Sequence, residues 1–212
     1  FYLDASAEGA FDTILGNAGI VIGTGGVVET ESIALFADVN YDLTERLHLG
    51  LGIRYTEDSK TGTVFRANYL GATRSPLLGG TPRAPLLLRT DYTNDRTFDD
   101  VSPRIALSYD FSDDITGYAS WSSGFKSGGF DMRGDAILTP DTVDGYEPET
   151  VDSYELGLKG RAGPLSFSSS IFYNQYEDQQ VTTQVPAVGG IASFVDNVGQ
   201  STLYGAEFEG SV

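Results

Sequence analysis

The sequence predicts an all-β protein, the wall of an antiparallel transmembrane β-barrel, and three observations lead to this fold class. Apolar and polar residues alternate with a period of two in one segment after another, as they do on a pleated strand with two different faces. Many segments run to about ten residues, which is typical of tilted membrane-spanning strands and longer than the roughly five or six of soluble proteins. Short and long connections alternate between them, as in outer-membrane barrels.

The alternation is clearest in residues 47–56, where Leu, Leu, Leu, Ile and Tyr hold the odd positions and His, Gly, Gly, Arg and Thr the even ones. Tyr118 stands out because it falls among polar positions. No helical period competes, so each segment is expected to be a strand. The expected strands, after a stub at 1–4, are 32–41, 47–56, 103–111, 115–125, 153–159, 165–174 and 204–209.

The charges inside these segments all lie at the polar positions. A face that excludes charge is expected to meet lipid, and the opposite face is expected to line a wetted lumen. The residues predicted to face the lumen are Asp38, Arg54, Arg104, Asp110, Glu155, Lys159, Glu207 and Glu209.

The connections differ in length, which indicates the direction of the chain. Tight turns are predicted at 42–45, 112–114 and 162–164. Long polar loops are predicted at 5–30, 59–96 and 127–148, with a shorter one around 186–190. Because barrels of this kind have short periplasmic turns and long external loops, we expect the turns in the periplasm. Aromatic residues near segment ends are placed as in membrane girdles; they are Tyr41, Tyr55, Phe111, Phe125 and Tyr173.

The composition excludes several classes of function. Thirteen Lys and Arg against thirty Asp and Glu give a net charge of −17, which argues against a nucleic-acid partner. The chain has no cysteine and one histidine, so no metal site, no cofactor and no catalytic constellation is predicted. No apolar run is long enough for a membrane-spanning helix.

Two loops carry unusual charge. Residues 59–96 hold six of the thirteen basic residues, which could recognise an anionic ligand through bidentate arginine, although a solvated loop is the simpler interpretation. The candidates for external ligand contact are Arg66, Arg74, Arg83 and Arg89. Residues 127–148 are acidic but lack the spacing of a calcium loop, so a solvated loop is expected there.

Four stretches resemble the barrel of TonB-dependent outer-membrane receptors. They are YASWSSGFKSGGF (118–130), LHLGLGIRYTEDSKT (47–61), YEPETVDSYELGLKG (146–160) and NVGQSTLYGAEFEG (197–210). The resemblance covers roughly 30–212. The chain departs from the usual pattern at Trp121, where Tyr is more common, and at Ser123, where a basic residue often stands.

The resemblance implies a 22-stranded up-and-down barrel in the outer membrane of a Gram-negative bacterium. Such a receptor takes up a scarce ligand, such as an iron–siderophore complex or another nutrient. Its partners are outer-membrane lipid, its own plug domain, the TonB energy-coupling protein and a small-molecule or metal-chelate ligand. Residues 1–212 are expected to be a partial barrel domain, with the plug outside this segment.

Three other interpretations compete with this one. A soluble β-sandwich shares the alternation, but strand length, loop asymmetry and aromatic placement favour the membrane barrel. A complete eight-stranded barrel with a structural or adhesive role is the alternative function. A membrane-embedded hydrolase rests on His48 alone.

Overall fold

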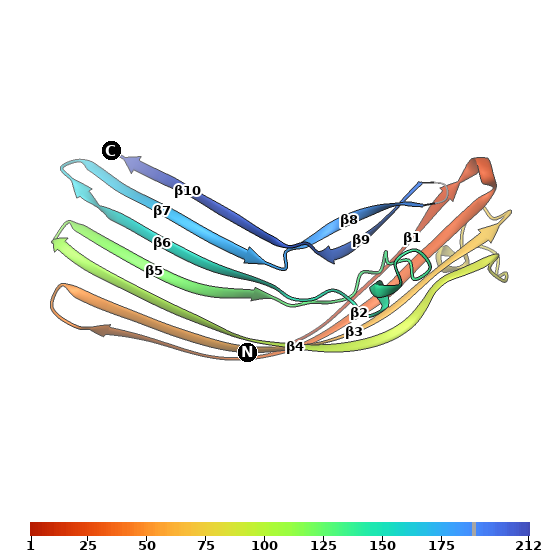
Figure 1. Ribbon diagram of the computed structural model, residues 1–212, viewed down its shortest axis with the longest axis horizontal. Helices are drawn as coiled ribbons and strands as arrows, with labels where there is room; N and C mark the ends of the chain where they lie inside the picture. The colour runs from red at the N-terminus through yellow and green to blue at the C-terminus, as the bar shows by residue number, and fades with distance from the viewer. Residues whose placement is uncertain (188–189) are drawn as a thin grey trace.

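The computed structural model describes residues 1–187 and 190–212, and Figure 1 shows them as a long, curved, antiparallel sheet. Eight strands are hydrogen-bonded in the order β1-β2-β3-β4-β5-β6-β7-β10, and β8 and β9 form a separate hairpin. The strands are β1 (Tyr2–Leu15), β2 (Ile20–Asp42), β3 (Leu47–Leu70), β4 (Leu87–Ser112), β5 (Ile115–Lys126), β6 (Glu149–Ala162), β7 (Leu165–Glu177), β8 (Gln180–Ala187), β9 (Gly190–Asn197) and β10 (Gln200–Ser211).

The register confirms the predicted alternation of faces. Leu51 on β3 pairs with Val39 on β2 and with Ile105 on β4, so apolar residues of neighbouring strands share one face. Leu51 and Ile105 are exposed on that face, which we call the outward face. The opposite, polar face carries His48 and Arg54.

The sheet is open within the described residues. There β1 pairs only with β2, and β10 pairs only with β7. Because a complete small barrel requires its first and last strands to be paired, the eight-stranded alternative is not favoured.

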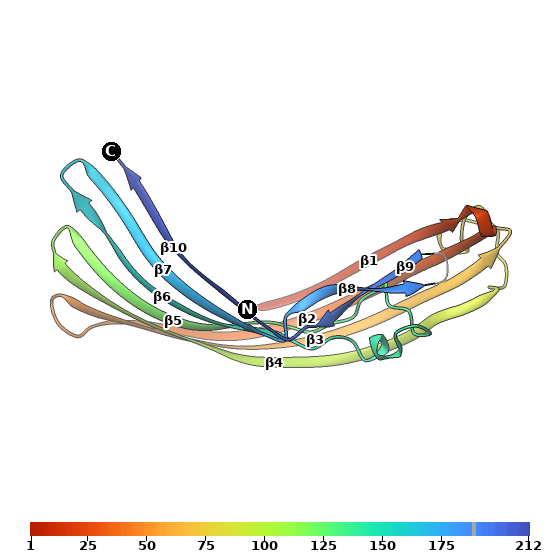
Figure 2. The same cartoon turned by 45° about the horizontal axis from the view of Figure 1, so that its top comes forward.

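The three predicted turns are confirmed. Residues 43–46, 113–114 and 163–164 join β2 to β3, β4 to β5 and β6 to β7. Figure 2 shows them at one end of the sheet, while the longer connections lie at the other end.

Two predicted loops are wrong. Most of 5–30 belongs to β1 and β2, and 59–96 belongs to β3 and β4 except for the connection 71–86. Apolar periodicity fades in these stretches although the hydrogen-bonded ladder continues. A strand that extends beyond the membrane has water on its outward face, so that face need not be apolar.

The helical segments are short 3₁₀ turns at Gly16–Ala18, Pro76–Leu78 and Pro140–Val143. Within residues 1–187 and 190–212, no helix is long and apolar enough to cross a membrane.

Apolar burial is concentrated at the end of the sheet that carries the long connections. The fully or nearly fully buried apolar side chains there include Val21, Val64, Tyr69, Phe98 and Phe130. The outward face near the turns instead exposes its large apolar side chains, so the packed core lies between the extended strands and the loop that covers them.

Candidate functional site

Residues 127–148, which we call the docked loop, lie on the polar face of the strand extensions. Phe130 covers Gly62 on β3, and Met132 covers Gly26 on β2 and Gly9 on β1. A Cβ atom at Gly62 would lie 2.5 Å from Cγ of Phe130. The absence of a side chain at these strand positions therefore lets the loop approach the backbone closely.

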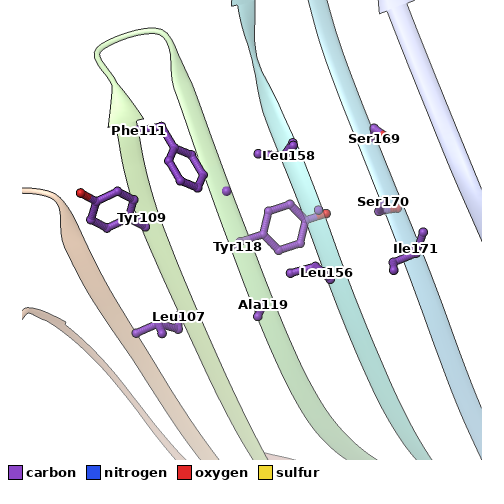
Figure 3. Close-up of a pocket in the computed structure, with 12 residues that line it drawn as sticks. Leu107, Tyr109, Phe111, Tyr118, Ala119, Leu156, Leu158, Ser169, Ser170 and Ile171 are labelled. Carbon is purple, nitrogen blue, oxygen red and sulfur yellow. The ribbon is translucent and has the colours of Figure 1, made fainter.

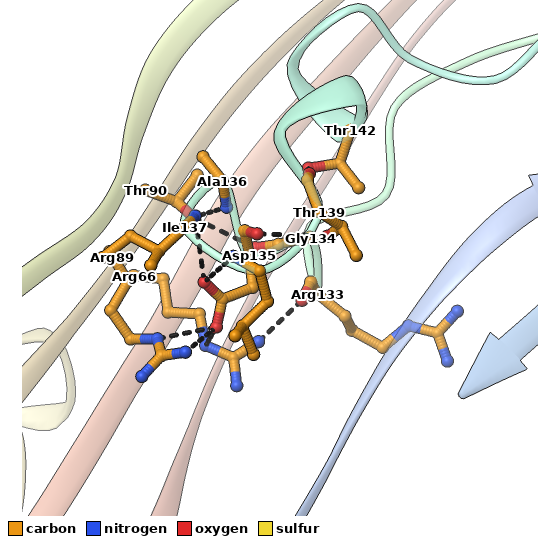
Figure 4. Close-up of polar contacts among 11 residues, drawn as sticks. Arg66, Arg89, Thr90, Arg133, Gly134, Asp135, Ala136, Ile137, Thr139 and Thr142 are labelled. Atoms are coloured by element: carbon orange, nitrogen blue, oxygen red, sulfur yellow. Dashed lines mark hydrogen bonds and ion pairs between the residues drawn. The ribbon is translucent and has the colours of Figure 1, made fainter. Parts of the chain in front are cut away.

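Asp135 anchors the docked loop between two arginines (Figure 4). Its side chain is 1% exposed. Arg89 on β4 donates from Nε to Oδ2 of Asp135 at 2.6 Å and forms an ion pair with the same oxygen. Nε of Arg66 on β3 lies 3.8 Å from that oxygen. Since a buried charge is costly unless it is paired and hydrogen-bonded, Arg89 and Arg66 allow this carboxylate to be buried.

Backbone groups complete the surroundings of Asp135. Nη1 of Arg66 donates to the carbonyl of Arg133 at 2.7 Å. The hydroxyl of Thr90 donates to the carbonyl of Gly134 and accepts from the amide of Ala136 at 3.0 Å. Burial lowers the pKa of Arg66, although the nearby carboxylate opposes this effect. The cluster fixes the loop to both β3 and β4.

A row of side chains on β4 holds the other half of the docked loop. Tyr92, Asn94 and Arg96 point to one face because they are two residues apart. Each donates to the next loop carbonyl in turn, at residues 142, 143 and 144, over 3.2, 2.9 and 3.1 Å. Burial raises the pKa of Tyr92 to about 12, so its hydroxyl remains protonated, and therefore a donor, well above neutral pH.

The hairpin of β8 and β9 contacts the docked loop through Asp131. This carboxylate is paired with Arg133, whose Nη2 is 2.8 Å away, and it accepts from the amide of Val195 at 2.8 Å. Asn197 donates to the carbonyls of Glu147 and Asp178. A cavity of about 440 Å³ remains between the loop and β9.

The four arginines predicted as ligand contacts separate into two pairs. Arg66 and Arg89 meet at Asp135. Arg74 and Arg83 lie in the connection 71–86, where they donate to the carbonyls of Leu78 and Leu70. They line a cavity of about 530 Å³ within that connection.

The expectation of a solvated acidic loop at 127–148 is wrong for two of its carboxylates. Asp131 and Asp135 are 9% and 1% exposed. The solvated interpretation also fails for Arg66 and Arg89. Asp135 is paired with residues more than forty positions away in the chain, a relationship that spacing along the sequence does not show. Sequence reasoning also missed Gly62 and Thr90 as parts of this site.

On the polar face near the turns, His48 lies between two carboxylates. Its Nδ1 is 2.6 Å from Asp42 Oδ1 and its Nε2 is 3.0 Å from Asp110 Oδ2. Thr116 donates to Asp110 at 2.7 Å. Both ring nitrogens are engaged by carboxylates, so among residues 1–187 and 190–212 neither contacts a hydroxyl nucleophile as a catalytic triad requires.

The other residues predicted for the lumen follow the same parity. Asp38 lies opposite Gly52, which in turn lies opposite Arg104. The Nε of Arg54 donates to Thr56 at 3.0 Å. The remaining four lie on β6 and β10: Glu155 accepts from the hydroxyl of Tyr118, and the register pairs Lys159 and Glu209 with Ser168 and Glu207 with Ser170.

Comparisons with known proteins agree with this architecture. The family model described as TonB dependent receptor-like, beta-barrel matches residues 2–212. Pesticin receptors of Yersinia enterocolitica and Yersinia pestis are each 24% identical over 184 residues, covering 87% of this chain and 24% of the relative.

Solved structures show the same fold. The ferric yersiniabactin uptake receptor FyuA from Yersinia pestis has a TM-score of 0.70 at 20% identity, covering 89% of this chain and 25% of that chain. The ferric-catecholate import receptor Fiu from Escherichia coli K12 has a TM-score of 0.60 at 13% identity, covering 99% and 35%. The chain thus spans about a quarter of the length of the pesticin receptors. It belongs to the TonB-dependent receptor family, as part of the β-barrel that these receptors form in the outer membrane of Gram-negative bacteria.

Proposed function

We propose that this chain is a barrel segment of a receptor that imports a scarce ligand, such as an iron–siderophore complex or another nutrient, across the outer membrane. The match to the receptor barrel family over residues 2–212 carries the proposal. Related structures are described as uptake or import receptors for ferric yersiniabactin and ferric catecholate. The complete receptor would add a plug domain and use energy delivered by TonB.

The polar face would line the lumen and hold the plug. Its charges are of both signs, and the hydrogen bonds that they form with neighbours on the wall include Arg54 to Thr56 and Thr116 to Asp110. Contacts of this kind are weak when water reaches them, so a plug held by them could be released without unfolding the wall. The residues proposed for this role are Asp38, Arg54, Arg104, Asp110, Glu155, Lys159, Glu207 and Glu209.

The four external arginines would have two different roles in ligand recognition. Arg74 and Arg83 are exposed around the cavity of the connection 71–86 and are proposed to contact an anionic ligand directly. Arg66 and Arg89 form ion pairs with Asp135. They would act indirectly, by holding the docked loop at the mouth of the lumen.

Uptake of radioactive ferric iron tests the proposal. A strain that lacks the receptor gene would be supplied with ferric catecholate, hydroxamate and citrate chelates, with and without the restored full-length receptor. We expect uptake of at least one chelate to require both the receptor and TonB, and the double variant Arg74→Ala/Arg83→Ala to reduce it. Import of iron chelates is rejected if no chelate shows this dependence.

A further inference from the structure

At residues 117 and 119, the outward face of β5 carries smaller side chains than the outward faces of the strands beside it. Gly117 and Ala119 hold successive outward positions on β5. Ala119 pairs with Leu107 on β4 and Leu156 on β6, while Gly117 pairs with Tyr109 and Leu158. A groove of about 470 Å³ lies above Ala119, between the large side chains of β4 and β6, and extends to Ser169 and Ile171 on β7 (Figure 3).

Packing fixes the groove at the end near the turn 113–114. There Phe111 covers Gly117, which is buried, and a Cβ atom at residue 117 would lie 2.6 Å from the ring of Phe111. Tyr109 supports Phe111 edge to face at 5.1 Å. Trp121 is the next outward residue of β5 beyond Ala119, and it donates from Nε1 to Asp152 at 3.1 Å, which holds the indole in place.

We propose that this groove binds one acyl chain of a glycerophospholipid. The groove is continuous with the exposed apolar surface of β3 and β4, which contacts lipid in an outer-membrane barrel. Its walls stand two strand spacings apart, about 10 Å, which leaves room between the side chains for a single hydrocarbon chain. It lies beside the short turns, the end we place in the periplasm, so a lipid of the periplasmic leaflet is its occupant.

The groove should retain the acyl chain because protein side chains contact the chain on several sides. Lipid tails gain no hydrophobic free energy by leaving other tails for an apolar protein surface. A chain in the groove instead touches a floor and two walls of fixed side chains, and it gains dispersion contacts that a flat face does not offer. The bound chain should therefore exchange more slowly than the lipids around it.

Native mass spectrometry of the full-length receptor in mild detergent tests the groove. Ala119→Phe should fill the groove, and Ala37→Phe is the matched control because Ala37 is an exposed outward alanine on β2, outside the groove. We expect the wild type and Ala37→Phe to retain phospholipid and Ala119→Phe to retain at least tenfold less. Equal retention in all three, or retention of lipopolysaccharide instead, would overturn the proposal.

A second measurement uses unaltered packing, in case Ala119→Phe does not fold. Phospholipid with a brominated acyl chain is added to the detergent-solubilised receptor, and the fluorescence of Trp121 is isolated by subtracting a Trp121→Phe variant. We expect quenching to saturate near one lipid per receptor. Quenching that rises with lipid concentration without saturating would show ordinary annular contact and reject the site.

Discussion

Gly62 on β3 and Phe130 in the docked loop fit together without space for a side chain at residue 62. A Cβ atom there would lie 2.5 to 2.7 Å from three atoms of Phe130. Phe130 itself is 5% exposed. The loop therefore depends on a glycine in the middle of a strand, where glycine otherwise weakens the strand.

Replacing this glycine should release the loop. Gly62→Ala is expected to destabilise docking by about 1–3 kcal/mol, because extra atoms in a packed contact force displacement. Limited proteolysis of the receptor should then cut within 127–148. Gly124→Ala is the control, since its Cβ would meet only Val151 at 3.4 Å. Equal resistance to protease in both variants would contradict the fit.

The ion pairs of Asp135 should contribute more to the stability of the docked loop than an exposed ion pair does. Asp135→Asn leaves two buried guanidinium groups without their carboxylate and should cost about 3–5 kcal/mol of loop stability. Glu147→Gln removes the partner of Arg96, a pair whose carboxylate is 59% exposed, and should cost less than about 1 kcal/mol. Hydrogen exchange of the loop amides measures both. If the two variants behave alike, Asp135 is not the anchor.

Charge should be tolerated on one face of β4 only. Ile105→Arg places a cation on the outward face and should cost about 2–4 kcal/mol if it lies near the bilayer midplane. Ala106→Arg, one residue along and on the polar face, should cost much less. Refolding titrations in lipid vesicles compare the two, and a similar loss in both would mean that the assigned faces are wrong.

Cysteine labelling on intact cells tests the direction of the chain. The chain has no cysteine, so a single substitution reports its own position in this segment. Thr81→Cys and Asp141→Cys should react with an impermeant maleimide, and Asp113→Cys should not. All three positions are exposed. Reaction at Asp113 alone would invert the topology.

The faces of the strands, the turns and the family could all be predicted from the order of the residues. A period of two fixes which side chains share a face, because a strand leaves no freedom in that choice. Leu51 and Ile105 were both predicted on the apolar face, and they lie there side by side. The turn predicted at 112–114 is found at 113–114. Strand lengths were underestimated where both faces contact water or loop, since apolar alternation is then no longer required. The hairpin of β8 and β9 was not predicted.

The position of the docked loop could not be predicted in this way. In the sequence, Asp135 is one carboxylate of an acidic stretch, and Arg66 and Arg89 belong to a basic stretch. Their pairing depends on how a loop folds back over strands from a distant part of the chain. Local patterns carry no information about such a contact, because loop closure is set by packing and burial at the contact rather than by the residues along the way.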